Sequence, residues 1–194
     1  FFSLIFTMIA CIILGMGLPT TANYVVTATI AAPVLINDFG VLPIAAHMFV
    51  FYFGIVADIT PPVCLAAYAG AGIARANPFK SGVTAVKLAI AAFIIPYIFI
   101  YNPILLLQDI TPIRLIISLL TAIIGMTAVS SAVIGLFIRS SYSWERLILF
   151  IAGVMLIVPD LVISLIGLLL LLGVWYIQKQ RKDDSGEMKA RLSV

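Results

Sequence analysis

Charged residues are scarce in this sequence. Of its 194 residues, only 10% are Asp, Glu, Lys or Arg, whereas a typical soluble domain has about 25%. A water-soluble fold of this size could not find enough polar residues to cover itself. The scarcity therefore excludes a soluble globular domain, a disordered segment and a nucleic-acid-binding protein.

The residues and motifs of common active sites are also scarce or missing. Cys11 and Cys64 lie in apolar runs without CxxC spacing, so we interpret them as small core residues. The only histidine, His47, also lies in an apolar run, which favours a packed imidazole over a proton relay. The sequence contains no HExxH, GxSxG or Walker A motif, which argues against an enzyme and against direct use of ATP. We expect no cofactor.

Apolar residues are abundant instead. They make up 63% of the chain, and the mean hydropathy is +1.23. We therefore expect an all-α polytopic membrane protein, with lipid as the solvent of most of its surface. The net charge of +3 mainly reflects a basic tail. Five of the 11 cations lie in it: Lys179, Arg181, Lys182, Lys189 and Arg191.

Two apolar segments are interrupted by helix-breaking residues. The runs 1–14 and 22–36 flank the sequence GMGLPTT, and each is shorter than the roughly 20 residues of a membrane crossing. We expect a re-entrant helical hairpin with its tip at 15–21. The runs 44–56 and 63–74 flank Asp58-Ile59-Thr60-Pro61-Pro62 and predict one crossing that is broken in the middle.

The later segments predict ordinary spans. Residues 84–107 form a full crossing with a kink at Pro96, and 113–138 form another. The run 147–177 is divided at Pro159-Asp160, so it either crosses once as a tilted span or is partly re-entrant. The side of the charged tail from Gln178 therefore stays open. These boundaries divide the chain into 1–82, 83–110, 111–177 and 178–194.

Paired broken segments point to the binding site of a transporter. An unwound segment frees carbonyl groups for a cation, and the half-helix after it directs its positive end at an anion. Neutral side-chain oxygens near the breaks suit Na⁺, which needs several oxygens and little formal charge. They belong to Thr20, Thr21, Asn23 and Thr60.

Several motifs, in order, resemble the large membrane subunit of TRAP (tripartite ATP-independent periplasmic) transporters. They are GMGLPTTANYVVTATIAAPVL, AAHMFVFYFGIVADITPPVCLAAYAGAGIA, NPFKSG and IIPYIFIYNPILLL. The resemblance covers about residues 1–107 and is closest to the fused form, in which small and large membrane subunits share one chain. Residues 108–194 would correspond to its extra C-terminal helices. We therefore expect this chain to be a C-terminal piece of a longer protein.

The resemblance implies an elevator-type carrier in a bacterial or archaeal inner membrane. A periplasmic binding protein would deliver organic acids or related solutes, a Na⁺ gradient would drive uptake, and a small subunit or its fused domain would lie upstream. The implied substrate- and ion-binding residues are Gly15, Gly17, Thr20, Thr21, Asn23, Asp58, Thr60 and Pro61. Among them, Gly15, Thr21 and Thr60 are the candidates for Na⁺ itself.

Two questions stay open at this stage. Asp58 is either a functional carboxylate beside the break or a carboxyl hydrogen-bonded to the unwound backbone. A channel or a purely structural membrane subunit is the alternative to a carrier, because channels also use re-entrant loops and half-helix dipoles.

Overall fold

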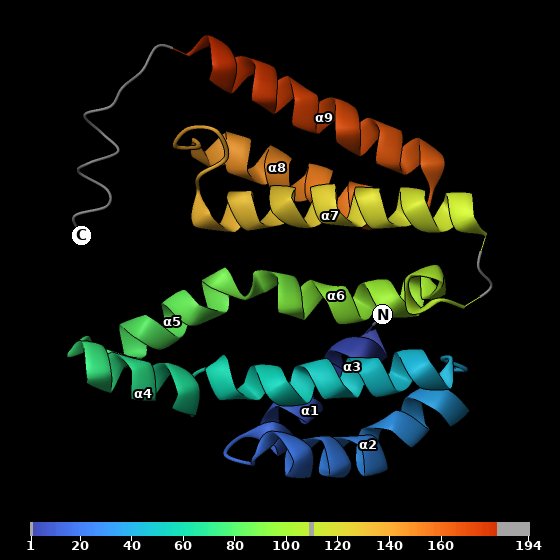
Figure 1. The fold of residues 1–194 in the computed structure, drawn as a ribbon, viewed down its shortest axis with the longest axis vertical. Helices are drawn as coiled ribbons and strands as arrows, with labels where there is room; N and C mark the ends of the chain where they lie inside the picture. The colour runs from blue at the N-terminus through green and yellow to red at the C-terminus, as the bar shows by residue number, and fades with distance from the viewer. Residues whose placement is uncertain (1, 109–110, 182–194) are drawn as a thin grey trace. The chain divides into compact units, whose positions relative to one another are not determined.

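The computed structural model describes residues 2–108 and 111–181 (Figure 1). Within these ranges the chain is helical and has no β-strand. It divides into two compact units, Phe1–Leu119 and Leu120–Val194. In the described part of the chain, three helical segments are long and apolar enough to cross a membrane: Pro78–Tyr101, Pro112–Ile134 and Leu161–Gln180. The predicted fold class, an all-α polytopic membrane protein, is confirmed.

The first unit begins with the helical hairpin. Helix α1 (Phe2–Gly15) and helix α2 (Thr20–Asn37) contact each other and are joined by a four-residue turn. Gly17 has φ of +79° in this turn, a conformation that favours glycine. The Gly/Pro tip of the sequence therefore reverses the chain.

The broken helix forms the centre of the first unit. Helix α3 (Pro43–Val56) continues into the short 3₁₀ helix η1 (Ala57–Ile59), and α4 (Leu65–Ala74) follows after a non-helical stretch. Helix α3 contacts α1, α2 and α6. Its buried Phe49 and Phe53 recur one turn apart and pack edge-to-face against Tyr97.

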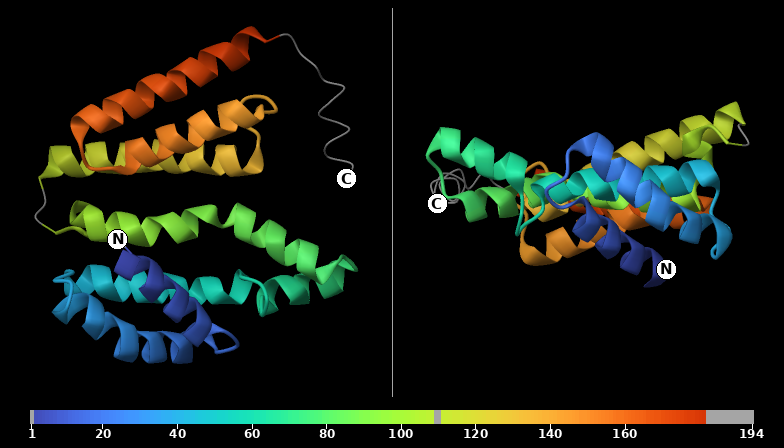
Figure 2. Two further views of the ribbon diagram at one scale, coloured as in Figure 1. Left: turned by 180° about the vertical axis from the view of Figure 1, so that it is seen from behind. Right: turned by 90° about the horizontal axis from the view of Figure 1, so that it is seen from below.

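The next span consists of α5 (Pro78–Leu88) and α6 (Ile90–Tyr101), followed by η2 (Pro103–Leu106). It begins six residues earlier than the sequence suggested, because the Asn77 side chain caps α5 by accepting the Lys80 N–H at 3.0 Å. The interruption lies at Ala89, where Ala92 N–H bonds to Ala89 O in a tight turn. Pro96 lies inside α6. Figure 2 shows the bend between α5 and α6.

The second unit contains α7 (Pro112–Ile134) from Leu120 on, together with α8 (Ser143–Ile157) and α9 (Leu161–Gln180). The single tilted span considered for 147–177 is wrong, because α8 and α9 lie side by side. Val158 is extended ahead of Pro159, and Asp160 caps α9 by accepting the N–H groups of Val162 and Ile163.

Helices α8 and α9 run antiparallel, so the end of α9 returns to the start of α8. There, Gln178 donates hydrogen bonds to Ser141 and Glu145. The start of the tail therefore lies at the same end of this unit as the α7–α8 loop. Asp109 and the tail beyond Arg181 lie outside the described residues.

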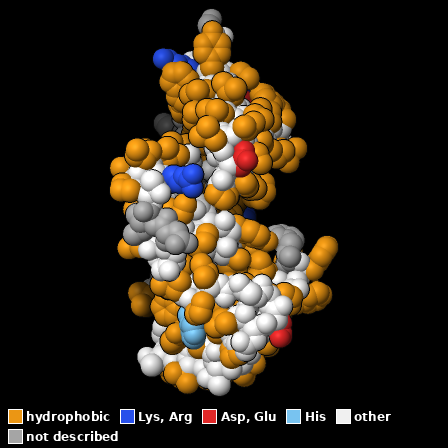
Figure 3. All heavy atoms as spheres, turned by 90° about the vertical axis from the view of Figure 1, so that its right-hand side faces the viewer, with side chains coloured by type: hydrophobic (Ala, Val, Ile, Leu, Met, Phe, Trp, Pro, Cys, Tyr) orange, Lys and Arg blue, Asp and Glu red, His pale blue; other side chains and the backbone are white. Residues whose placement is uncertain are grey.

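The surface is largely apolar. Figure 3 shows one face on which hydrophobic side chains predominate and charged side chains are few. Large apolar side chains of α7 are strongly exposed, among them Ile113 (70%), Ile116 (59%) and Leu120 (54%). Such exposure fits a surface in contact with lipid.

Candidate functional site

The tip of the hairpin meets the end of α3 at a single buried amide. Asn23, in the first turns of α2, is 0% exposed. Its Nδ2 donates to Gly15 O at 3.2 Å and to Gly54 O at 2.6 Å. One side chain therefore joins both arms of the hairpin to the helix that leads into the break.

Two glycines make room for this amide. A Cβ at Gly15 would lie 2.6 Å from Asn23 Nδ2 and 2.7 Å from Gly54 O. A Cβ at Gly54 would lie 2.5 Å from Asn23 Oδ1. All three distances are shorter than real Cβ contacts, so a larger residue at either position would displace the amide.

Sequence reasoning predicted Gly15 and Asn23 as site residues but missed Gly54. The available signal was a glycine within the aromatic run FVFYFG, one turn before Asp58. The contact with Asn23 links positions 31 residues apart. Local sequence patterns do not reveal such a distant pair.

The other half of the Asn23 amide has no protein partner. Oδ1 is buried, and none of the described residues donates a hydrogen bond to it. An unpaired acceptor in an apolar interior destabilises the fold by about 1–3 kcal/mol. The oxygen is therefore a candidate ligand for a cation or for a donor group of a solute.

The break itself is held by local hydrogen bonds. Thr60 Oγ1 donates to Val56 O at 2.7 Å, and Thr60 N–H donates to Ala57 O at 3.2 Å. The Thr60 oxygen keeps lone pairs that can accept or ligate. Helix α1 contacts η1, so the hairpin lies against the start of the break.

Cys64 and Tyr68 hold the second half of the break. Cys64 Sγ donates to Ile59 O at 3.1 Å, and Tyr68 OH donates to Pro62 O at 3.0 Å. Asp58 is half-buried in η1, and Pro61 packs close to Gly82 of α5. These contacts place Asp58, Thr60 and Pro61 in one short irregular segment.

The remaining predicted residues lie on the outer side of the tip. Gly17, Thr20 and Thr21 are exposed, and the two threonines are the first residues of α2. The structure therefore joins Gly15 and Asn23 directly and leaves these three at the open surface of the turn.

The two helices that follow the breaks start without side-chain caps. Pro19 precedes α2 and Cys64 precedes α4, and neither side chain accepts a bond from the helix. Neither first turn contains an acidic residue. The partial positive charge of each start is thus not offset by a local carboxylate.

His47 is half-buried on α3. Its Nδ1 lies 3.1 Å from the hydroxyl of Tyr24, across the contact between α2 and α3. This contact fits the packed-imidazole interpretation. Among the described residues, no three His, Cys, Asp or Glu side chains cluster as a metal site would require.

The chain matches the model of a known protein family. The family model described as "Tripartite ATP-independent periplasmic transporter, DctM component" matches residues 1–114. These residues include the hairpin, the broken helix and the α5–α6 span. Neither the curated proteins nor the solved structures gave a match.

Proposed function

We propose a function from the premise that this chain belongs to the family of DctM components of tripartite ATP-independent periplasmic transporters. This is a family of membrane components for solute uptake and not a family of enzymes. We propose that the chain carries the hairpin and broken helix of a Na⁺-coupled carrier of organic acids in a bacterial or archaeal inner membrane. Its partners would be a periplasmic binding protein and a small membrane subunit or its fused equivalent.

The unpaired Oδ1 of Asn23 is the observation that carries the proposal. It lies where the hairpin meets the helix leading into the break, and the groups around it are backbone carbonyls and neutral side chains. Neutral oxygens suit Na⁺. Asn23, with Thr60 and backbone carbonyls of the tip and the break, would supply the part of the ion site that lies on this chain. Gly15 and Thr21 are the further candidates.

The uncapped helix starts support an anionic solute. Thr20 and Thr21 present hydroxyl groups at the start of α2, and α4 begins just after Pro61-Pro62. Free N–H groups and the helix dipole together favour a carboxylate at such a position. This is the part of the substrate site that we assign to the present chain.

The packing around α3 supports movement as one block. Helix α3 contacts both arms of the hairpin, and Asn23 fixes the tip to Gly54. An elevator mechanism requires the ion and solute sites to move together. The shared amide provides that connection.

Uptake into proteoliposomes tests the proposal. The complete transporter, with its binding protein, should take up a labelled organic acid only when a Na⁺ gradient is present. Asn23→Ala should lower uptake by at least roughly tenfold, because it removes about 1.4 kcal/mol or more of binding interaction. The matched control is Asn37→Ala, since Asn37 is exposed at the end of the same helix.

The dependence on Na⁺ concentration separates ion binding from packing. If Asn23 ligates Na⁺, Asn23→Asp should change the Na⁺ concentration that gives half-maximal uptake. A change in uptake by the same factor at all Na⁺ concentrations would reject the ligand role. Uptake that persists with choline in place of Na⁺ would reject the coupling.

The two alternatives predict other outcomes. A channel would give unsaturable flux that does not require the binding protein. A purely structural subunit would keep full uptake in Thr21→Ala and Thr60→Ala.

A further inference from the structure

The second unit lies outside the family match and has several cations gathered at one end. We call this end the basic end and define it by Arg139 of the α7–α8 loop, Arg146 of α8, Lys179 of α9 and Arg181 just after α9. The antiparallel packing of α8 and α9 brings these positions together, although they span more than 40 residues of sequence. Between Leu120 and Arg181 the acidic residues are Glu145 and Asp160, and Asp160 lies at the opposite end of α9.

A buried polar network holds the basic end in place. The Arg181 guanidinium pairs with the buried Glu145 carboxylate and donates to Ser140 O. Arg139 donates to the backbone carbonyl of Arg181. Arg146 donates to the last carbonyls of α7, at 2.7 Å to Ala132 O and 2.9 Å to Val133 O. Within the described part of this end, the four cations outnumber the one acidic side chain, that of Glu145.

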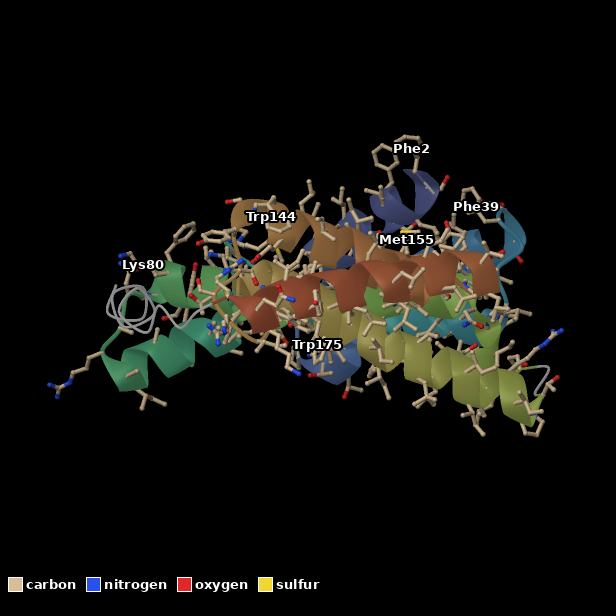
Figure 4. All side chains as sticks on the ribbon, turned by 90° about the horizontal axis from the view of Figure 1, so that it is seen from above. Phe2, Phe39, Lys80, Trp144, Met155 and Trp175 are labelled. Atoms are coloured by element: carbon tan, nitrogen blue, oxygen red, sulfur yellow. The ribbon has the colours of Figure 1, made fainter. Side chains whose placement is uncertain are left out.

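Exposed aromatic side chains surround these cations. Tyr142, Trp144 and Trp175 are 49%, 47% and 39% exposed. Lys179 Nζ lies 4.8 Å from the centre of the Trp175 ring, and the Arg181 guanidinium lies 4.1 Å from that of Tyr142. Figure 4 shows Trp144 and Trp175 extending outward from α8 and α9. Aromatic rings beside cations are typical of the membrane–water interface.

We propose that the basic end of the second unit binds the headgroups of anionic phospholipids. The excess of positive charge complements phosphate, and the exposed rings, together with Leu136 (47% exposed) and Ile138 (45%), provide an apolar border. A soluble anion needs no such border, whereas a lipid covers it with glycerol and acyl groups. The assignment also places the loop 135–142 and the start of the tail at the cytoplasmic surface.

Tryptophan quenching by brominated lipids tests the proposal at this site. The complete transporter is reconstituted in vesicles of phosphatidylcholine with equal fractions of brominated phosphatidylglycerol or brominated phosphatidylcholine. The site signal is the quenching that is lost in Trp175→Phe. We expect brominated phosphatidylglycerol to quench Trp175 more strongly than the zwitterionic lipid does.

The Lys179→Gln variant should lower the preference for phosphatidylglycerol about fivefold, the effect of one cation at an anionic surface. Lys179 is exposed and lies over an exposed ring, so its removal leaves the buried network intact. Lys80→Gln is the matched control, because Lys80 is an exposed lysine of the first unit. It should leave the Trp175 signal unchanged.

Three outcomes would overturn the proposal. The first is equal quenching of Trp175 by the two brominated lipids. The second is an equal loss of preference in Lys179→Gln and Lys80→Gln, which would indicate a general surface potential. The third is displacement of the lipid by glycerol phosphate at matched concentration, which would indicate a site for soluble anions. If Lys179→Gln does not fold, a preference unaffected by added NaCl in the parent protein rejects the proposal equally.

Discussion

Each unit buries polar side chains between apolar helices, but within the described residues only those of the second unit are all hydrogen-bonded. Gln178 is 0% exposed and uses both ends of its amide. Its Nε2 donates to Ser141 and Glu145, and its Oε1 accepts the N–H groups of Ile138 and Arg139. Asn23 is equally buried, yet its Oδ1 has no partner among the described residues. The difference separates a polar group that holds helices together from one that is available to a ligand.

The helix starts show the same contrast. Asp160 caps α9, and Glu145 accepts the Tyr142 N–H at the start of α8. In the first unit, α2 and α4 follow the two breaks without a side-chain cap. We infer that the paired groups of the second unit stabilise its fold. The unpaired Asn23 oxygen and the uncapped starts of α2 and α4 in the first unit are available to bind ligands. The following variants test this contrast.

The largest effect is expected for Gly15→Ala. The added Cβ would lie 2.7 Å from the backbone oxygen of Gly54, so the hairpin tip must move away from α3. We expect a loss of about 2–3 kcal/mol in the free energy of unfolding and a roughly hundredfold lower uptake rate, as is typical when binding groups are displaced by about 1 Å. Unfolding in detergent and proteoliposome uptake measure the two effects.

Gly70→Ala is the matched control for that variant. Gly70 lies in α4, and a Cβ there meets no atom within 4 Å. Alanine should therefore preserve uptake and slightly favour the helix. If Gly15→Ala and Gly70→Ala had equal stability and equal uptake, the contact between the hairpin tip and α3 would not explain the contrast between the units.

Glu145→Ala in the second unit comes next, because it should lower stability and leave uptake unchanged. The substitution leaves Arg181 without its carboxylate and removes one acceptor from the buried Gln178. We expect about 3 kcal/mol lower stability but unchanged uptake for each folded molecule. Glu145→Gln, which keeps a hydrogen-bonding oxygen, should have a smaller effect. A Glu145→Ala protein that is stable but inactive would contradict the structural role of this network.

The sequence predicted local breaks better than contacts between distant residues. The two breaks were predictable because Gly, Pro and Thr interrupt a helix wherever they cluster. The packing of α8 against α9 was not predicted, because Gln178 finds its partners 33 and 37 residues earlier in the chain. For the same reason Gly54 was missed. Local breaks are visible in a sequence, whereas the partner of a buried amide is known only after folding.

A smaller effect is expected for Asp160→Ala. The Asp160 side chain accepts the N–H groups of Val162 and Ile163 at 2.9 and 3.0 Å. Loss of this cap should lower stability by about 1 kcal/mol, which a thermal unfolding curve in detergent can measure. Asp160→Asn keeps an accepting oxygen and should retain most of the stability. Uptake should be unchanged in both variants, and a loss of uptake in Asp160→Ala alone would connect this unit to transport.

Pro19→Asp is expected to change stability least, but it is the sharpest test of the contrast between the units. Pro19→Asp would give α2 the acidic cap that α9 already has, since Pro19 has extended backbone angles that aspartate also adopts. A carboxylate there should stabilise the helix by about 0.3–1 kcal/mol. It should also lower uptake of an anionic solute, because the new carboxylate occupies the free N–H groups and repels the solute charge. Pro19→Asn provides a neutral cap and should affect uptake less. A gain in stability with unchanged uptake in Pro19→Asp would mean that the open start of α2 is not part of the solute site.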